Sequence, residues 1–308
     1  MSVIRSLSVG NGDMFYIKHN SMNFSIIDCC LIDDKKDAII KEIKAECDGE
    51  RMRRFISTHP DEDHIRGIED LCQEFAIWNF YCVKNEATKK DPSQDFKYYV
   101  KLRDSKTNVD VYNLTKGCRR KWMNDEGKDD DGCDYGSAGI HILWPDKDDD
   151  EVEKWLKSAA DGKTYNNISP IIIYRCHNSA VAMWMGDVET DYVEKIKDKV
   201  NWPKVDILFA PHHGRDTAKL PESVLKDLSA KVVVIGEGQS DELNYYSGYD
   251  TLTQNRAKNI TFVCRAGKVD VFSSSESYKP GTDFLKEDTG ISYKEEHYLG
   301  SFDTHHTA

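Results

Sequence analysis

The chain has 308 residues, 39% of them hydrophobic and 31% charged, which is enough for one large domain or two ordinary ones. A formal net charge of −12 argues against a protein that holds nucleic acid mainly through a broad basic surface, although metal ions can supply positive charge locally in a nuclease. No apolar run reaches the roughly 18 residues of a transmembrane helix, and residues 1–9 lack the apolar region of a signal peptide. The nine cysteines contain no CxxC pair, so we expect a reduced, cytoplasmic protein with no membrane partner.

Short strands and helices alternate along the first part of the chain. Apolar patterns predict helices at 36–47 and about 65–75, and strands at 3–9, 14–17, 24–28, 54–57 and 77–83. The turn Gly10-Asn11-Gly12-Asp13 is interpreted as a hairpin loop, because no Gly-Lys-Ser/Thr follows it as in a phosphate loop. Residues 86–137 lose apolar periodicity, so we expect an inserted excursion: helix at about 94–105, otherwise exposed loop that could form a lid. Its acidic run at 129–132 lacks the oxygen spacing of a calcium loop and is interpreted as solvated.

The second part of the chain continues the alternation. It predicts helices at 151–160, 190–200 and 221–228, and strands at 140–145, 171–174, 181–185, 205–210, 231–235, 260–263 and 269–272. The last of these strands is expected to close the sheet, which places one α/β domain at 1–275. Residues 276–308 are expected to be a polar C-terminal tail, and the pair His305-His306 at its end is left out of the site.

One stretch, Ser57-Thr58-His59-Pro60-Asp61-Glu62-Asp63-His64, concentrates chemistry. Four side chains that can bind metal fall where a buried strand ends and a helix begins: His59, Asp61, Asp63 and His64. Without a metal this would be a self-repelling acidic cluster, so a charged surface loop is the weaker interpretation. His59 and Asp61 could project together from an extended turn while Asp63 and His64 point toward a second position, so the turn could serve two ions.

Two further strands end in potential ligands. Asp187 follows the strand at 181–185, and His212 and His213 follow the strand at 205–210. Because histidine and carboxylate are ligands of divalent cations, this recurrence indicates a metal site. Asp28 ends the buried strand at 24–28 and needs a partner there, so it is expected to orient a ligand histidine.

These motifs resemble the metallo-β-lactamase superfamily, whose fold is an αββα sandwich with the site at one edge of two facing sheets. The order of motifs is similar to the lactamase-like domain of the DNA-uptake (competence) proteins of the ComEC type. The matching elements are Val9 to Asp13, Ile26 to Asp28, His59 to His64, Asn167 to Ser169, Gly186-Asp187 and Pro211 to Gly214. Asp61 stands where the superfamily has a second histidine, as in the competence branch, while that branch's later Gly-His-Pro element is absent around Tyr249.

The resemblance implies a metal-dependent hydrolase with two divalent ions, manganese or zinc. The implied metal ligands are His59, Asp61, Asp63, His64, Asp187 as the bridging carboxylate, and His213. Asp63 or Asp61 could also hold the attacking water. His212 could protonate the leaving oxygen or orient a phosphate or, equally well, only pack behind His213. Asn167 and Ser169 are expected to support the ligands from behind, and Arg66, Arg215 and Lys219 could contact phosphate.

Phosphodiester cleavage of a nucleic acid or nucleotide substrate is the favoured function. The alternatives are a hydrolase of small esters, lactones or thioesters, and a non-catalytic sensor with a structural metal; the intact ligand set argues against the sensor. The acidic surface favours small or single-stranded substrates over duplex DNA.

Overall fold

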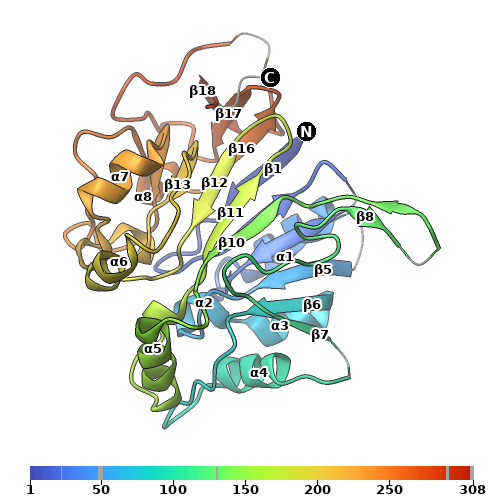
Figure 1. The fold of residues 1–308 in the computed structure, drawn as a ribbon. Helices are drawn as coiled ribbons and strands as arrows, with labels where there is room; N and C mark the ends of the chain where they lie inside the picture. The colour runs from blue at the N-terminus through green and yellow to red at the C-terminus, as the bar shows by residue number, and fades with distance from the viewer. Residues whose placement is uncertain (22, 48–50, 108, 130, 289–290, 306–308) are drawn as a thin grey trace.

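The computed structural model describes residues 1–308 except 22, 48–50, 108, 130, 289–290 and 306–308, and its strands form two large sheets (Figure 1). The larger sheet has nine strands in the order β18-β17-β16-β1-β2-β3-β5-β6-β7. Their bounds are β1 (Ser2–Ser6), β2 (Phe15–Lys18), β3 (Phe24–Ile27), β5 (Arg51–Ile56), β6 (Ala76–Cys82), β7 (Asp110–Asn113), β16 (Ile260–Arg265), β17 (Lys268–Ser273) and β18 (His297–Asp303). The strands β3, β5, β6 and β7 are parallel, so their carboxyl ends share one edge.

The smaller sheet has six strands in the order β10-β11-β12-β13-β14-β15. Their bounds are β10 (Ile140–Trp144), β11 (Ile171–Arg175), β12 (Val181–Trp184), β13 (Ile207–Phe209), β14 (Val232–Ile235) and β15 (Thr251–Thr253). From β12 to β15 the strands are parallel, and the ends of β12 and β13 are therefore neighbours. Of the described strands, three short ones belong to neither large sheet. They are β4 (Cys29–Cys30) and the antiparallel pair β8 (Gly127–Lys128) and β9 (Asp134–Tyr135).

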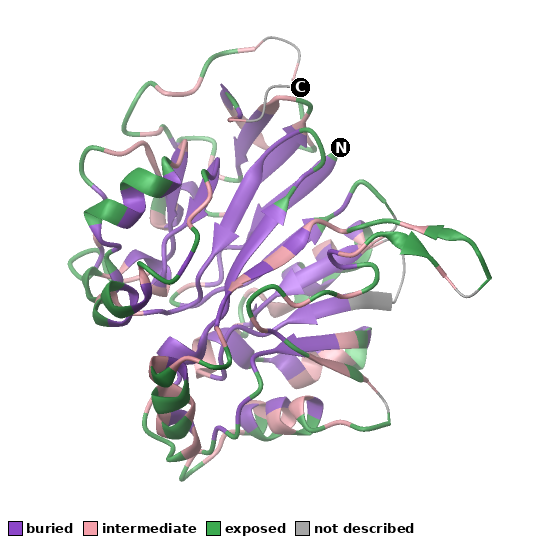
Figure 2. Ribbon diagram, viewed as in Figure 1, coloured by how far each residue is buried: buried purple, intermediate pink, exposed green. Residues whose placement is uncertain are grey.

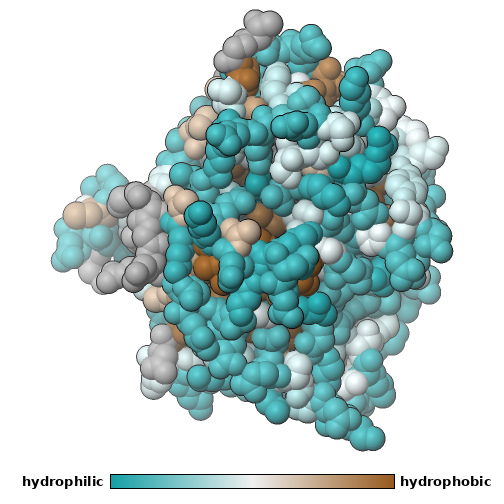
Figure 3. Space-filling model, turned by 180° about the vertical axis from the view of Figure 1, so that it is seen from behind, coloured by the Kyte–Doolittle hydropathy of each residue, from teal (hydrophilic) through white to brown (hydrophobic). Residues whose placement is uncertain are grey.

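The two sheets face each other across an aromatic core. Phe209 of the small sheet lies 4.8 Å, ring centre to ring centre, from Phe15 of the large sheet and 6.1 Å from Phe262. Burying such rings together with the aliphatic residues of the same cluster stabilises the packing of the two sheets. Figure 2 shows the strands buried along most of their length, with exposed residues gathered on helices and loops. Figure 3 shows hydrophilic residues over most of the opposite face of the molecule.

Helices cover the outer faces of both sheets. Ile43 of α1 and Leu71 of α3 pack in one cluster with Phe55 and Phe80 of the large sheet, while Val193 of α6 packs with Leu208 of the small sheet. The helix bounds are α1 (Lys36–Glu46), α2 (Glu62–Ile65), α3 (Ile68–Glu74), α4 (Gln94–Arg103), α5 (Asp150–Ala160), α6 (Thr190–Ile196), α7 (Glu222–Leu228), α8 (Gln254–Ala257), η1 (Asn166–Ile168), η2 (His212–Gly214) and η3 (Asp216–Ala218). The predicted αββα sandwich is confirmed by this layering. None of the helices within the described ranges has both the length and the apolarity to cross a bilayer.

The excursion expected at 86–137 is only partly outside the sandwich. The helix predicted near 94–105 is present as α4, but its Phe96, Tyr99 and Leu102 are buried against the large sheet, and β7 extends that sheet at its edge. The prediction of an insertion was therefore wrong up to the end of β7. The apolar signal is weak there because α4 buries one narrow stripe and an edge strand is half exposed. From the excursion's acidic run, Asp130 lies outside the described residues.

The β8–β9 hairpin does leave the sandwich, whereas Met123 before it stays buried in the core between the sheets. In Figure 1 this hairpin projects from the side of the molecule away from α2. The candidate ligands of the central motif lie on and around α2, so the hairpin does not cover them as the expected lid would.

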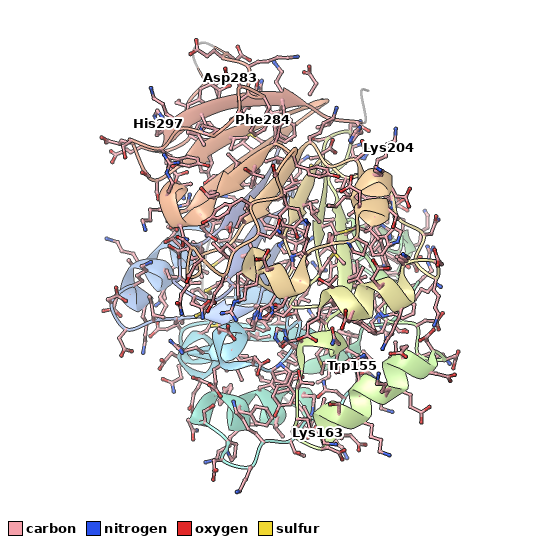
Figure 4. The ribbon with its side chains drawn as sticks, turned by 90° about the vertical axis from the view of Figure 1, so that its left-hand side faces the viewer. Trp155, Lys163, Lys204, Asp283, Phe284 and His297 are labelled. Atoms are coloured by element: carbon pink, nitrogen blue, oxygen red, sulfur yellow. The ribbon has the colours of Figure 1, made fainter. Side chains whose placement is uncertain are left out.

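The predicted polar tail was also wrong. Strand β18 pairs with β17 and forms the sheet's edge, so β17 does not close it, and Tyr278 and Phe302 are buried. Asp283, Phe284 and His297 of this segment lie at the end of the molecule remote from Trp155 and Lys163 (Figure 4). The strand was hard to detect because Gly300, with φ of +129°, and a register shift at Val271/Phe272 interrupt its alternation. His305 is anchored, since its backbone N–H donates to Asp206 at 2.7 Å; His306 lies outside the described residues.

Candidate metal centre

The central motif folds as an extended turn followed by one turn of helix. Ser57 N–H donates to the carbonyl of Tyr81, which fixes the start of the turn beside β6, and α2 then begins after the extended residue Asp61. His59 and His64 are buried while Asp61 stays partly exposed. The turn therefore carries its two imidazoles inward. It lies between the carboxyl end of β5 and the start of α2, the strand-to-helix junction that the sequence predicts.

The loop between β1 and β2 lies directly against this turn. The backbone N–H of Asp13 donates to the carbonyl of Asp63 at 3.1 Å. A Cβ atom on Gly12 would lie 2.6 Å from Cys30 Sγ and 2.7 Å from that same carbonyl, so only glycine allows the approach. The loop thereby delivers the Asp13 carboxylate to the site, which the sequence interpretation as a plain hairpin missed.

Asp187 is the centre of the cluster, and it follows β12. Its Oδ1 lies 3.0 Å from His64 Nε2, whereas its Oδ2 lies 3.7 Å from His59 Nε2 and 3.8 Å from His213 Nε2. The preceding Gly186 has φ of +53°, and a Cβ there would meet Ser169 Oγ at 2.5 Å. The two oxygens of one buried carboxylate thus face different imidazoles, which is the arrangement a bridging ligand requires.

The histidine pair after β13 adopts an unusual backbone. His212 and His213 have φ of 52° and 57°, the left-handed region that side-chain-bearing residues rarely occupy. The N–H of His212 donates to the carbonyl of Gly186 at 2.9 Å, so the two strand ends are tied together. This conformation turns His213 inward, where its Nε2 lies 3.3 Å from Asp63 Oδ2.

Two carboxylates hold histidine rings from behind. Asp28 Oδ2 lies 2.8 Å from His64 Nδ1, and the same carboxylate accepts from the N–H and hydroxyl of Thr58 at 2.7 and 2.6 Å. Asp13 Oδ1 lies 3.1 Å from His213 Nδ1 in the same way. In both cases the outer ring nitrogen faces a carboxylate and Nε2 faces Asp187, the usual arrangement of carboxylate, histidine and metal.

The remaining predicted residues surround His59 and Asp187. Ser169 Oγ lies 3.2 Å from His59 Nδ1, and Asp61 Oδ2 lies 3.5 Å from His59 Nε2. The Asn167 side chain accepts from Glu189 N–H at 2.9 Å, two residues beyond Asp187. Asn167 therefore holds the turn that carries Asp187.

His212 stands at the rim of the cluster. Its Nε2 lies 3.6 Å from Asp187 Oδ2 and 3.4 Å from Arg215 Nη1, and its side chain is 14% exposed. Burial lowers the pKa of His212 below its ordinary value, so its ring is neutral at neutral pH. Arg215 also donates from Nη2 to Asn11 Oδ1 at 3.0 Å, which places its guanidinium at the rim.

The charges of the cluster need a compensating cation. Burial by itself would raise the pKa of Asp187, but His64, His213 and His59 hold it well below its ordinary range. Conversely, burial would lower the pKa of His213, but Asp13 and Asp187 raise it to about 10. Without metal, protons on the imidazoles thus neutralise the carboxylates, and divalent cations are the alternative source of that charge.

The donor set fits a metal ion. His64, Asp187, His213 and Asp13 each offer a ligand atom within 4.8 Å of the others. Among the described residues, His59 Nε2, His64 Nε2 and Asp187 Oδ1 are buried without a hydrogen-bond partner, an expensive condition that coordination would relieve. His59, Asp61 and Asp63 reach the edge of the same group through the 3.3–3.7 Å contacts described above.

Comparison with known proteins gave structural likenesses alone. No family model and no curated protein matches the sequence. The structure is similar to Igni18, a metallo hydrolase of Ignicoccus hospitalis, with 15% identity, TM-score 0.47, and coverage of 85% of this chain and 99% of that one. It is similar to a diphosphatase of the PhnP family with 13% identity, TM-score 0.43, and coverage of 82% and 94%. It is also similar to a putative zinc-dependent hydrolase of the metallo-β-lactamase superfamily from Thermotoga maritima, with 11% identity, TM-score 0.30, and coverage of 79% of each chain. At such identities these likenesses establish no shared activity.

Proposed function

We propose that this protein is a metal-dependent hydrolase of the metallo-β-lactamase superfamily that cleaves phosphodiester bonds. The observation that carries the proposal is the convergence of His59, His64 and His213 on the two oxygens of the buried Asp187. These residues come from three separate strand ends, so chance packing is a poor explanation. The kinship with the competence-type domain belongs to the same proposal and is supported by the order of the motifs.

The ligands divide around Asp187. His64, Asp63 and His213 would hold one ion on the side supported by Asp28 and Asp13, whereas His59 and Asp61 would hold a second. Divalent cations bound there would lower the pKa of a bound water and offset negative charge that develops on the substrate. Mixed imidazole and carboxylate ligation suits manganese and zinc.

Residues at the rim would handle the substrate. Arg215 Nε has no hydrogen-bond partner in the described part of the chain, and its ion pair with Glu242 is long at 3.8 Å. A guanidinium placed in this way suits a phosphate oxygen, which favours a phosphodiester over a neutral ester or lactone. The neutral His212 beside it would donate a hydrogen bond to a substrate oxygen or orient the phosphate.

The proposal is tested by metal analysis together with a substrate panel. Purified protein loaded with manganese or zinc should hydrolyse bis-p-nitrophenyl phosphate faster than p-nitrophenyl acetate or a homoserine lactone, and Arg215→Gln should lower the phosphodiester rate alone. The matched control is Arg256→Gln, which removes an exposed arginine that lies against Tyr278. Hydrolysis of only the ester or lactone would reject the phosphodiester assignment, and absence of bound metal would reject the hydrolase itself.

A further inference from the structure

A cavity apart from the metal centre lies against β5, β6 and β7. It has a volume of about 750 Å³ and is lined by Arg54 of β5, three residues of β6, Tyr112 of β7, the β2–β3 turn and residues 119–122. The candidate metal centre follows β5, beyond Ile56. The cavity lining, as far as the structure describes it, contains none of the candidate metal ligands, so the two sites are separate.

The cavity lining is basic, whereas the chain as a whole is acidic. As far as the structure describes it, the lining includes Arg54, Arg119, Arg120 and Lys121 but no aspartate or glutamate, although the chain has 54 acidic residues and a net charge of −12. Arg119 is already paired with Asp125. The cavity is therefore a local concentration of positive charge on an acidic protein, and its potential favours an anion.

Two of these arginines have a buried Nε atom without a hydrogen-bond partner among the described residues. Arg54 is 4% exposed and donates to Ser25 Oγ at 2.9 Å and to the carbonyl of Trp122 at 2.8 Å, yet its Nε is buried without a hydrogen-bond partner. The Nε of Arg120 is buried in the same condition. Across the described residues, neither guanidinium has a carboxylate within 4.0 Å. A buried cation of this kind lacks its counter-charge, and a phosphate would provide it.

Aromatic rings form the rest of the wall. Trp78 and Trp122 are 38% and 45% exposed, which is unusual for tryptophan, and both line the cavity. Behind them Tyr81 and Tyr112 stack at 4.9 Å with an angle of 28° between the rings. The guanidinium of Arg120 lies 5.0 Å from the centre of the Tyr112 ring, so charge and aromatic surface meet at one place.

We propose that this cavity binds a nucleobase together with its adjoining phosphate, the chemistry of a nucleotide or of a single strand of nucleic acid. Exposed indole rings offer a face on which a base stacks, and Arg54 and Arg120 offer donors for the phosphate. The side chains of Asn23 and Asn79 also line the cavity, beside the rings and the arginines. This binding would not require the metal centre, and it would give the acidic protein a place to hold a single strand.

The test measures binding with the chelator EDTA present, so that hydrolysis cannot consume the probe. The probes are adenosine diphosphate and a fluorescein-labelled single-stranded DNA of about 12 nucleotides. Binding is followed by fluorescence anisotropy for the DNA and by tryptophan quenching for the nucleotide. Displacement of the DNA by adenosine diphosphate would identify a single nucleotide as sufficient, whereas binding of the DNA alone would identify a strand as the ligand.

Variants locate the binding. Trp122→Ala and Arg120→Gln should each weaken binding at least about tenfold, while Trp122→Phe should retain most of it because a stacking face remains. Arg256→Gln is the matched control, since Arg256 also lies against a tyrosine ring, at 5.7 Å from Tyr278, away from the cavity. Folding of every variant is checked by its melting temperature.

Three results would overturn the proposal. The first is that the parent protein binds neither probe. The second is that Trp122→Ala and Arg120→Gln, while folded, bind as tightly as the parent. The third is that polyphosphate or polyglutamate competes as well as the DNA, which would mean that the cavity recognises charge without a base.

Discussion

Asp13 Oδ1 lies 3.1 Å from His213 Nδ1, a contact between the first hairpin loop and the end of a strand in the other sheet. It mirrors the contact of Asp28 with His64, in which the distance is 2.8 Å. Each carboxylate fixes a ring so that Nε2 faces the centre of the cluster. Four predictions concern this centre, and a fifth concerns a buried histidine elsewhere.

Asp13→Asn should weaken metal binding by about 10- to 100-fold, because the amide holds the His213 ring less strongly than a carboxylate. The measurement is titration of metal-free protein with zinc or manganese. Asp34→Asn, at an exposed loop position, should leave the affinity unchanged. Equal affinities for Asp13→Asn and the parent would show that this carboxylate has no supporting role.

The purified protein should bind close to two divalent ions, since the ligands around Asp187 exceed what one tetrahedral ion uses. Their removal with EDTA should lower the melting temperature, because an ion at about 100 times its dissociation constant stabilises the native state by about 2.7 kcal/mol. Elemental analysis and calorimetry measure both effects. A ratio of one ion per chain would restrict the site to the His64 and His213 side.

Asp187→Asn should lose one ion and lower hydrolysis by about 10³-fold or more, because the amide cannot offset repulsion between two cations. His212→Ala should keep both ions and cost about 10²- to 10⁴-fold if the ring assists the leaving group. Metal content and rate are measured on the same samples. Full activity of Asp187→Asn with one ion lost would rule out bridged ions as the catalytic unit.

Gly12→Ala should displace the loop that carries Asp13, because the new Cβ would overlap Cys30 Sγ and the Asp63 carbonyl. We expect a loss of about 1–3 kcal/mol in the free energy of unfolding together with weaker metal binding. Gly136→Ala is the control, since no atom lies within 4 Å of a Cβ added there. Both variants are measured by urea unfolding and metal titration. Equal stability and equal metal affinity of Gly12→Ala and Gly136→Ala would show that the close approach at Gly12 is not required.

His19 should make the protein sensitive to acid. Burial lowers its pKa from 6.5 to about 3, so the folded state keeps the ring neutral while the unfolded state binds a proton below pH 6.5. Stability is therefore lost as the pH falls from about 6.5 toward 3, at up to about 1.4 kcal/mol per pH unit. His19→Gln removes this proton and should show a smaller difference in urea stability between about pH 6.5 and pH 4. Identical pH dependence in both proteins would show that His19 does not titrate in this window.

The resemblance of the motifs to the metallo-β-lactamase superfamily implied the sandwich, and periodicity located the strands whose ends carry His59, His64, Asp187 and His213. The sequence did not indicate Asp13. The pairing of that residue with His213 depends on a loop lying against another loop, and no periodic pattern reports such a contact. A carboxylate directly after Gly12, at the point where a hairpin turns, was the available signal.

Strands β7 and β18 were missed for a related reason. Both are sheet edges, where half-exposed residues weaken the alternation that identifies a strand, and Gly300 interrupts it further in β18. The buried stripe of α4 was narrow enough to pass for a surface helix. In each case long-range contacts decided the structure and local pattern did not.

The cluster draws His59, His64 and Asp13 from the larger sheet and Asp187 and His213 from the smaller one, across the face that Phe15 and Phe209 fill. During folding, the complete donor set can therefore assemble only after the two sheets have docked, a step that depends on contacts far apart in sequence and is slow for that reason. High-affinity metal uptake should accordingly appear with the last kinetic phase of refolding, later than the recovery of helical and strand signals. The ion would then serve as a reporter of the final docking event, and by binding the docked state alone it would slow the reverse step.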